Sequence, residues 1–347
     1  MKKILLYILI ISFNFIYAQK IESLKNIDKT YKINRNSILN IKNKYGSIYI
    51  NNWEKDSIEI KINISVKSKN KEISDKNLQL IITNIKQLND SIVAETIFKN
   101  NFSQNSKVIY TIDYHIKSPI YINLNLDNTY GNIHINELRG LTNIKLSYGK
   151  LFAKSLNFNP NRKLSKFDLS YCISKIDYCN YGEFNIKYGT FRLTEGKAVK
   201  INSNYTNLKL TKLQTLYLKS NYGTCRIDSL EITDINAKYL DVNIEYLNSK
   251  LKLNLIHGDC NINNISPFFN NIDIKAREGN LSLLIHPNAV YQLNAIIKQG
   301  EIEIPRKANL KKIYKKDLKE IKGVVGTKDK NITGKVKIDL TKGRINL

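Results

Sequence analysis

Residues 188–238 divide into three segments of 17 residues, YGTFRLTEGKAVKINSN (188–204), YTNLKLTKLQTLYLKSN (205–221) and YGTCRIDSLEITDINAK (222–238). Each segment begins with a tyrosine and continues with apolar residues that alternate with polar ones, as Leu208 and Leu210 do around Lys209. Alternation is the period of a β-strand. One segment alone cannot bury its apolar row, whereas stacked segments join their rows into a continuous interior. The sequence therefore predicts an all-β, single-stranded β-solenoid.

The tyrosine that opens each segment recurs along the chain, and we call it the ladder position. Its aromatic members are Tyr130, Tyr148, Tyr171, Tyr188, Tyr205, Tyr222 and Tyr239. His257, Glu278 and Gln299 continue the series, and Tyr45-Gly46 is an isolated earlier member. The spacings of 17–23 residues predict about ten coils.

The phase of the alternation gives an orientation for the ladder. Ile144, Leu146 and Tyr148 fall on one face of an extended strand, so we expect the tyrosines to face the interior and to stack along the solenoid axis. The following glycine, as at Gly149, suits a corner with positive φ or a close approach of two coils. The alternative is an aromatic strip that stacks on sugar rings.

The organisation at the two ends is less regular. We expect a signal peptide over 1–18, first coils over 19–128 with an insertion at about 67–107, and the solenoid with its cap over 129–347. In the insertion, Ser74 can cap a helix that continues through Leu78, Ile81, Ile82 and Ile85, and strands follow it. At the C-terminal end, we expect 336–347 to form a capping hairpin around Gly343, and 311–322 to form a charged, solvated loop.

The first residues are typical of a secretory signal. Lys2 and Lys3 precede the apolar run 4–17, and Ala18 is a small residue at the cut, which would make Gln19 the mature start. We therefore expect an exported protein, located in the periplasm, at the outer membrane or outside the cell. No later stretch is long and apolar enough to predict a membrane span.

The formal net charge of +25 invites a nucleic-acid interpretation, which we reject. Only eight of the 55 basic residues are arginine, and the positive charges are spread along the chain rather than clustered. A general attraction to acidic polysaccharide or to anionic lipid surfaces remains.

The four cysteines predict neither a cofactor nor a metal site. Cys225 and Cys260 hold the same place two coils apart, too far for a disulfide, and are expected to be small core residues. Cys172 and Cys179 could form a bridge only if the chain reversed between them. No CxxC pair exists and the histidines are scattered, so a zinc site has little support.

Two outward columns are candidates for binding or chemistry. Arg192, Lys209 and Arg226 lie four residues after the ladder position on consecutive coils and could meet a sulfated or carboxylated glycan or lipopolysaccharide phosphate. Their ordinary interpretation is solvated surface charge. Asp241 and Asp259 lie two residues after the ladder position and would be neighbours, able to hold Ca²⁺ or to act as acid and base. Their ordinary interpretation is a solvated polar column.

Several segments resemble a family of exported bacterial β-solenoids labelled putative adhesins, common in Bacteroidetes. They are Asn43-Lys44-Tyr45-Gly46-Ser47-Ile48, Asp113-Tyr114-His115-Ile116-Lys117-Ser118-Pro119 and Asn128-Thr129-Tyr130-Gly131-Asn132-Ile133 with Glu137-Leu138-Arg139-Gly140. The likeness spans nearly all of the mature chain. It implies a solenoid and an adhesive role, and it carries no catalytic residues. The loss of the glycine at Cys172, Thr206 and Leu240 predicts that those corners bend differently.

These observations favour a non-enzymatic, exported binding module, whose partner is an acidic glycan, lipopolysaccharide or another envelope protein. Two alternatives stay open. One is a polysaccharide-acting enzyme that uses Asp241 and Asp259 in a groove. The other is a structural or signalling component of the envelope with no small ligand.

Overall fold

The computed structural model describes residues 20–100, 102, 107–158, 164–304, 308–326 and 331–347. The predicted signal peptide over 1–18 lies outside these residues. The elements, in chain order, are β1 (Ile21–Lys32), β2 (Ile38–Lys44), β3 (Ile48–Asn52), β4 (Ser57–Ser68), α1 (Lys71–Leu78), β5 (Ile81–Leu88), β6 (Ser91–Phe98), β7 (Ile109–Ser118), β8 (Asn123–Thr129), β9 (Ile133–Leu138), β10 (Thr142–Leu156), β11 (Lys166–Ile256), β12 (Cys260–Ile265), β13 (Asn271–Arg277), β14 (Leu281–Ile285), β15 (Tyr291–Glu303), β16 (Ala308–Lys315), β17 (Leu318–Val325) and β18 (Gly334–Asn346).

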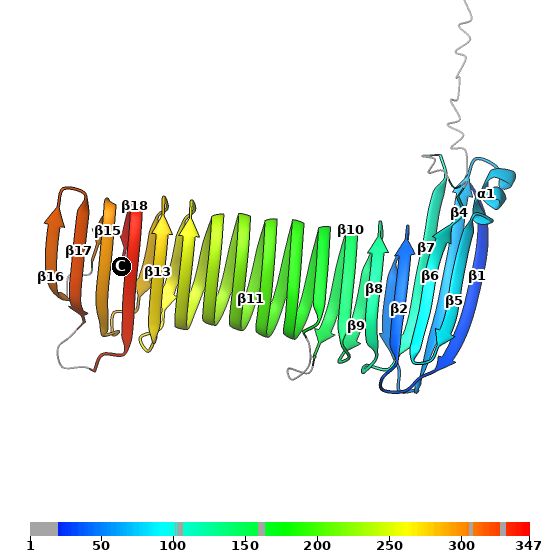
Figure 1. Ribbon diagram of the computed structural model, residues 1–347, viewed down its shortest axis with the longest axis horizontal. Helices are drawn as coiled ribbons and strands as arrows, with labels where there is room; N and C mark the ends of the chain where they lie inside the picture. Colours follow the sequence, from blue (N-terminus) through cyan, green and yellow to red (C-terminus); the bar gives the residue numbers. More distant parts are fainter. Residues whose placement is uncertain (1–19, 101, 103–106, 159–163, 305–307, 327–330) are drawn as a thin grey trace, which may run out of the picture.

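The predicted β-solenoid is confirmed, and Figure 1 shows it as an elongated stack of coils. Successive coils pair in parallel, as β10 does with β8 and β9 on one side and with β11 on the other. The element β11 winds through several coils without a break. Its alternating apolar side chains are buried and form one continuous core along the stack, as the repeat pattern requires.

Each coil turns at its ladder residue, which adopts a left-handed backbone conformation. Tyr148 has φ 58° and Tyr205 has φ 51°, and the other ladder residues are similar. The prediction that the tyrosines face the interior is therefore wrong: from Tyr130 to Tyr239 they are 41–49% exposed. Strand alternation assumes extended backbone, and a left-handed residue breaks it, so the tyrosine turns outward and the next residue turns inward.

The residue after each ladder tyrosine lies where neighbouring coils come closest. A Cβ added to Gly149 would lie 1.8 Å from the carbonyl oxygen of Gly131. Cys172, Thr206 and Leu240 are buried at this place, and each has a glycine at the equivalent place on both adjacent coils. The prediction that these corners bend differently is wrong at the ladder residue, because Tyr171, Tyr205 and Tyr239 have the common left-handed φ.

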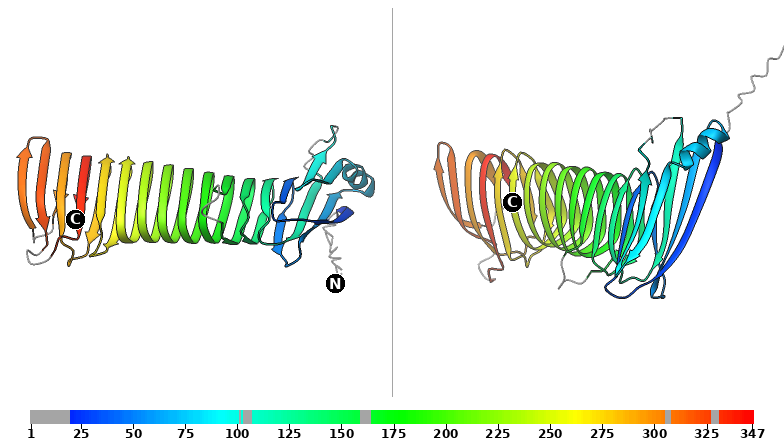
Figure 2. Two further views of the ribbon diagram at one scale, coloured as in Figure 1. Left: turned by 60° about the horizontal axis from the view of Figure 1, so that its bottom comes forward. Right: turned by 45° about the vertical axis from the view of Figure 1, so that its right-hand side comes forward.

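The strands before and after each ladder residue form two faces of the solenoid. At the N-terminal end, additional strands extend both faces beyond the first coil (Figure 2). On one side β3 pairs in parallel with β7, followed by antiparallel β4 and then β1. On the other side β2 pairs with β6, followed by antiparallel β5. Tyr45 thereby stacks directly on Tyr130, 85 residues later in the chain, with ring centroids 5.6 Å apart. Sequence analysis did not predict β1, because this edge strand is mostly exposed and lacks an alternating apolar row.

The predicted helix is present but was misplaced. α1 begins after Asn70, whose side chain accepts a hydrogen bond from the Ile73 amide, and it ends at Leu78. Ile81, Ile82 and Ile85 lie in β5, which pairs with β6. Short apolar runs fit helical and strand spacing equally well, so the sheet partner decides between them.

The C-terminal segment is a coil of the solenoid, not the hairpin expected for 336–347. β18 lies between β13 and β15 and pairs in parallel with both (Figure 1). Lys342 takes the ladder position with φ 58°, and its ammonium lies 3.7 Å from the Glu278 carboxylate. The coil of Gln299 thus comes before β18 in the chain, although β18 lies inside the stack and next to that coil.

A capping hairpin exists, but it comes from the segment expected to be a charged loop. β17 pairs antiparallel with β15, and β16 pairs antiparallel with β17. The outer strand β16 carries Lys311, Lys312 and Lys315 and is mostly exposed. Charged side chains on an edge strand oppose pairing with other chains, so the lysines protect this end from aggregation.

The close approach at the corners predicts the effect of adding a single methyl group. Gly223 has φ 144°, and a Cβ there would lie 2.1 Å from the Thr206 carbonyl oxygen. We expect Gly223→Ala to lower the free energy of unfolding by at least about 2 kcal/mol, measured by urea denaturation. The control is Thr206→Ala at the same place on the adjacent coil, which needs no new space. An equal or smaller loss for Gly223→Ala than for Thr206→Ala would contradict this account.

The ladder itself predicts a second outcome. Tyr205 stacks on Tyr188 at 5.2 Å and on Tyr222 at 4.7 Å. Tyr205→Ala removes both contacts and keeps a non-glycine residue in the left-handed region, so we expect a loss of about 1–3 kcal/mol in the same assay. Tyr205→Phe keeps the rings and should stay within about 0.5 kcal/mol of the wild type. A large loss in the phenylalanine variant would assign the stabilisation to the hydroxyl instead.

Candidate functional site

The ladder tyrosines form an exposed aromatic column, but it is poorly suited to stacking on sugars. From Tyr130 to His257 the ring centroids of neighbours are 4.7–5.2 Å apart, with interplanar angles of 1–17°. Each ring therefore covers the face of the next, and what remains exposed is the row of ring edges and hydroxyls. A sugar that stacks on an aromatic platform needs a free ring face. The geometry thus favours a structural role for this column.

The three basic residues selected from the sequence lie on the outer surface of the solenoid, on the strands that follow the ladder residues. Arg192, Lys209 and Arg226 are exposed and are spaced 17 residues apart, like the ladder tyrosines that precede them. Hydrogen bonds between residues 17 apart, such as Asn202 to Asn185 and Thr224 to Asn207, show that these coils are in register. None of the three cations forms an ion pair with another residue in the part of the chain that the structure describes.

The basic column is one part of a longer row, which sequence analysis missed. The same place, four residues after the ladder position, holds Tyr49, His134, Phe152 and Lys175 on the preceding coils. We call the outer row the set His115, Tyr49, His134, Phe152, Lys175, Arg192, Lys209 and Arg226. Reading this offset through every coil would have found it, apart from His115, which joins only through the pairing of β7 with β3.

The aromatic part of the outer row is itself stacked. Tyr49 lies between His115 and His134, with both centroid distances at 4.8 Å, and His134 stacks on Phe152 at 5.1 Å. A shallow hollow of about 330 Å³ is lined by His134, Phe152 and Lys175 where the aromatic part meets the basic part. After Arg226 the row continues as amides, and Asn261 donates to Asn243 at 3.2 Å. One straight row therefore passes from rings to cations to amides.

The electrostatic character of the row is positive along much of its length. Like charges on adjacent coils, about 4.8 Å apart, repel one another unless they are screened or bridged by an anion. Aromatic rings carry positive partial charge at their edges, and the stack exposes edges. The cations and the ring edges thus both favour an anionic partner.

The acidic pair proposed as an alternative site has structural partners. The Asp241 carboxylate accepts a hydrogen bond from the Asp259 amide at 3.2 Å, and the Asp259 carboxylate accepts one from the Asn280 amide at 2.8 Å. Asn132 acts in the same way toward the Lys150 amide. This column therefore ties each coil to the next through hydrogen bonds to main-chain amides.

The cysteines are buried and carry free thiols. Cys225 and Cys260 are core residues as expected, and burial raises the pKa of each thiol to about 12. Cys172 and Cys179 form no bridge. Within the described ranges no group of three or more histidine, cysteine or acidic side chains could hold a metal ion. No helix among the described residues is long and apolar enough to cross a membrane.

His134 provides a pH-dependent test of the aromatic stack. Desolvation between Tyr49 and Phe152 lowers its pKa from the usual 6.5. The folded protein therefore binds this proton less readily than the unfolded chain, so the contribution of His134 to stability is complete above pH 6.5 and falls as the pH drops toward the lowered pKa. His134→Phe should remove that part of the pH dependence, measured as urea midpoints between pH 7.5 and 5. Parallel midpoint curves for the two proteins would contradict the assignment.

Comparison with known proteins places this architecture in a family. No curated protein matches the chain. Among solved structures, it is similar to one described as a putative cell adhesion protein from Clostridium sporogenes, at 13% identity over 93% of this chain and 98% of that chain, with a TM-score of 0.20. It is also similar to one described as a putative adhesin from Bacteroides fragilis, at 12% identity over 93% and 96%, with a TM-score of 0.29. The family model described as Toastrack DUF4097 matches residues 36–347, so the chain belongs to the Toastrack DUF4097 family.

Proposed function

We propose that this protein is an adhesin-like, non-catalytic binding module that holds an acidic glycan along the outer row. The observation that carries the proposal is the continuity of the row: stacked ring edges from His115 to Phe152 lead directly into the cations Lys175, Arg192, Lys209 and Arg226. Because these groups recur at one strand spacing, they match a linear polymer better than a compact ligand.

The chemistry of the row favours carboxylate or sulfate groups on the ligand. The guanidinium groups of Arg192 and Arg226 can each donate two parallel hydrogen bonds to such a group. An anion between adjacent coils also relieves the repulsion between neighbouring cations. The hydroxyl of Tyr49 and the ring nitrogens of the histidines add donors suited to sugar hydroxyls.

Two further features support a binding role at the cell envelope. The positively charged, then apolar start of the chain over 1–18 supports export, which would bring the solenoid to polysaccharides of the envelope. The hydrogen bonds from backbone amides to Asp241 and Asp259 give these carboxylates a role in joining the coils, which supports a non-catalytic interpretation of this column. The proposal therefore places recognition, and no turnover, on this surface.

The test compares two triple variants with the same change in charge. Arg192→Ala, Lys209→Ala and Arg226→Ala together should weaken binding of heparin and of polygalacturonate at least tenfold, measured by biolayer interferometry at constant ionic strength. The control combines Lys187→Ala, Lys219→Ala and Lys238→Ala, which are exposed on the opposite sheet of the same region. It should change the affinity less than twofold.

Three results would overturn this proposal. Equal losses of affinity in both triple variants would mean that binding depends only on non-specific attraction between charges. Unchanged binding in the outer-row variant would place the site elsewhere. No binding of either polymer by the wild type would favour a structural component of the envelope.

A further inference from the structure

The hollow of about 330 Å³ beside the outer row is a trough between two columns of side chains. His134, Phe152 and Lys175 form one wall, at the fourth place after the ladder position. The other wall lies two residues further along the same strands and includes Asn136 and Lys154. The residues between the two walls point inward, so the main chain of the strands forms the floor. The trough is thus bordered by an aromatic wall and a polar wall.

One end of the trough is closed by an ion pair that joins its two walls. The Lys175 ammonium lies 3.6 Å from the Asp177 carboxylate, and these residues occupy the fourth and the sixth place of one coil. Both side chains are more than half exposed, at 57% and 51%, so a ligand can reach them. Exposed ion pairs contribute at most about 1 kcal/mol to stability, so a ligand can replace this contact at little cost.

The aromatic stack of the outer row ends at this trough. His134 covers one face of the Phe152 ring, with centroids 5.1 Å apart, and no other ring among the described residues stacks on Phe152. The adjacent place in the next coil belongs to Lys175, whose ammonium lies near Asp177. Phe152 therefore offers what the stacked ladder tyrosines lack, an aromatic face that the apolar face of a sugar can contact.

Asp177 is unfavourable for a site that recognises charge alone. A carboxylate beside the cations of the outer row repels the anions that those cations attract. Carboxylates are, however, strong acceptors for hydroxyl groups, because a charge-assisted hydrogen bond is about twice as strong as a neutral one. Asn136 and Lys154 supply donors on the same wall. The aromatic face, the acceptor and the cations together match a sugar that carries both hydroxyls and a carboxylate.

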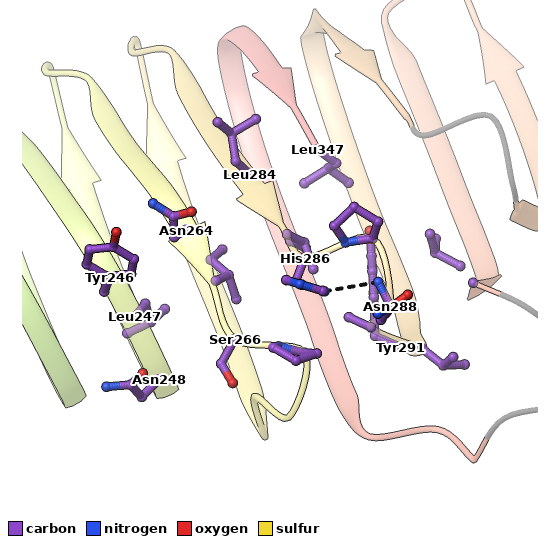
Figure 3. A pocket seen from close by; sticks show the side chains of 18 of the residues that line it. Tyr246, Leu247, Asn248, Asn264, Ser266, Leu284, His286, Asn288, Tyr291 and Leu347 are labelled. Atoms are coloured by element: carbon purple, nitrogen blue, oxygen red, sulfur yellow. Dashed lines mark hydrogen bonds between the residues drawn. The ribbon is translucent and has the colours of Figure 1, made fainter.

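Other hollows of the solenoid lack this combination. One of about 970 Å³ lies at the C-terminal end, where Tyr246, Asn264, His286 and Leu347 are among its lining residues (Figure 3). Its described lining contains no lysine, arginine or carboxylate side chain. Two hollows on the strands that precede the ladder residues contain lysines and Asp168, but no aromatic side chain is among their described lining residues. Of these hollows, the trough beside Phe152 fits an acidic sugar best.

We propose that the trough is a subsite for one uronic acid unit of the glycan. The pyranose ring packs on the uncovered face of Phe152, and its hydroxyls donate to the Asp177 carboxylate. Its own carboxylate lies between the ammonium groups of Lys154 and Lys175. This inference rests on the proposed function and deepens it, because the remaining cations of the outer row recognise charge, whereas the trough recognises the sugar that carries the charge.

The test compares two polymers, polygalacturonate, in which sugar rings carry the carboxylates, and polyacrylate, in which a hydrocarbon chain carries them. Phe152→Leu keeps an apolar side chain and removes the ring. Its affinity for polygalacturonate should fall about fivefold and its affinity for polyacrylate should change less than twofold, measured by biolayer interferometry at constant ionic strength. Phe152→Tyr keeps the ring and should bind both polymers like the wild type. The control Tyr217→Leu, which removes an exposed ring before the ladder residue Tyr222, should change neither affinity.

A second variant should act in opposite directions on the two polymers. Asp177→Ala removes a negative charge, so it should bind polyacrylate at least as tightly as the wild type does. It should bind polygalacturonate about fivefold more weakly, because the acceptor for the sugar hydroxyls is lost. Since Asp177 forms only an exposed ion pair, the urea unfolding midpoint should stay near that of the wild type.

The results distinguish a failure of this subsite from a failure of the proposed function. The subsite is refuted, and the outer row stands, if the outer-row triple variant loses affinity for polygalacturonate while Phe152→Leu and Asp177→Ala bind it like the wild type. Equal losses for both polymers in Phe152→Leu would assign Phe152 a structural role and would also refute the subsite. A wild type that binds no polygalacturonate would overturn the proposed function and the subsite together.

Discussion

The structure depends on one recurring constraint, a left-handed residue at the corner of every coil. An L-residue in this conformation costs about 1–2 kcal/mol, and stacking between neighbouring tyrosines offsets it by about 0.5–1.5 kcal/mol per pair. The corner also brings the next residue so close to the adjacent coil that a Cβ at Gly149 would meet a carbonyl oxygen at 1.8 Å. Together, the left-handed conformation and the close contact determine which later residues of each coil point inward and which point outward. They also explain why tyrosine is retained at a place that would otherwise favour glycine.

Once the phase is fixed, each offset from the ladder becomes a column with its own role. The third and fifth residues fill the core, the second ties coils together through side chain to amide hydrogen bonds, and the fourth builds the outer row. A solenoid can therefore change its outer surface without changing its interior, because the two sets of residues alternate along the same strand.

The ends of the stack show how an open solenoid avoids exposing its edges. At one end β1 and β4 continue a sheet, and α1 is tied to β1 by a hydrogen bond from Ser23 to Asp75 at 2.6 Å. At the other end the lysine-bearing strand β16 is outermost. The strand β18 is held on both sides by its parallel partners β13 and β15, so it lies inside the stack rather than at its tip.

The sequence by itself determined the solenoid, the length of its coils, the buried cysteines and the offset of the basic residues, because these depend only on periodicity. It could not determine the direction of the ladder tyrosines, since alternation cannot reveal a left-handed φ at Tyr148. It could not assign Ile81–Leu88 to a strand or place β18 between β13 and β15, because those outcomes depend on partners far away in the chain. Only the tertiary structure joined His115 to the outer row, since that depends on which strand lies next to which.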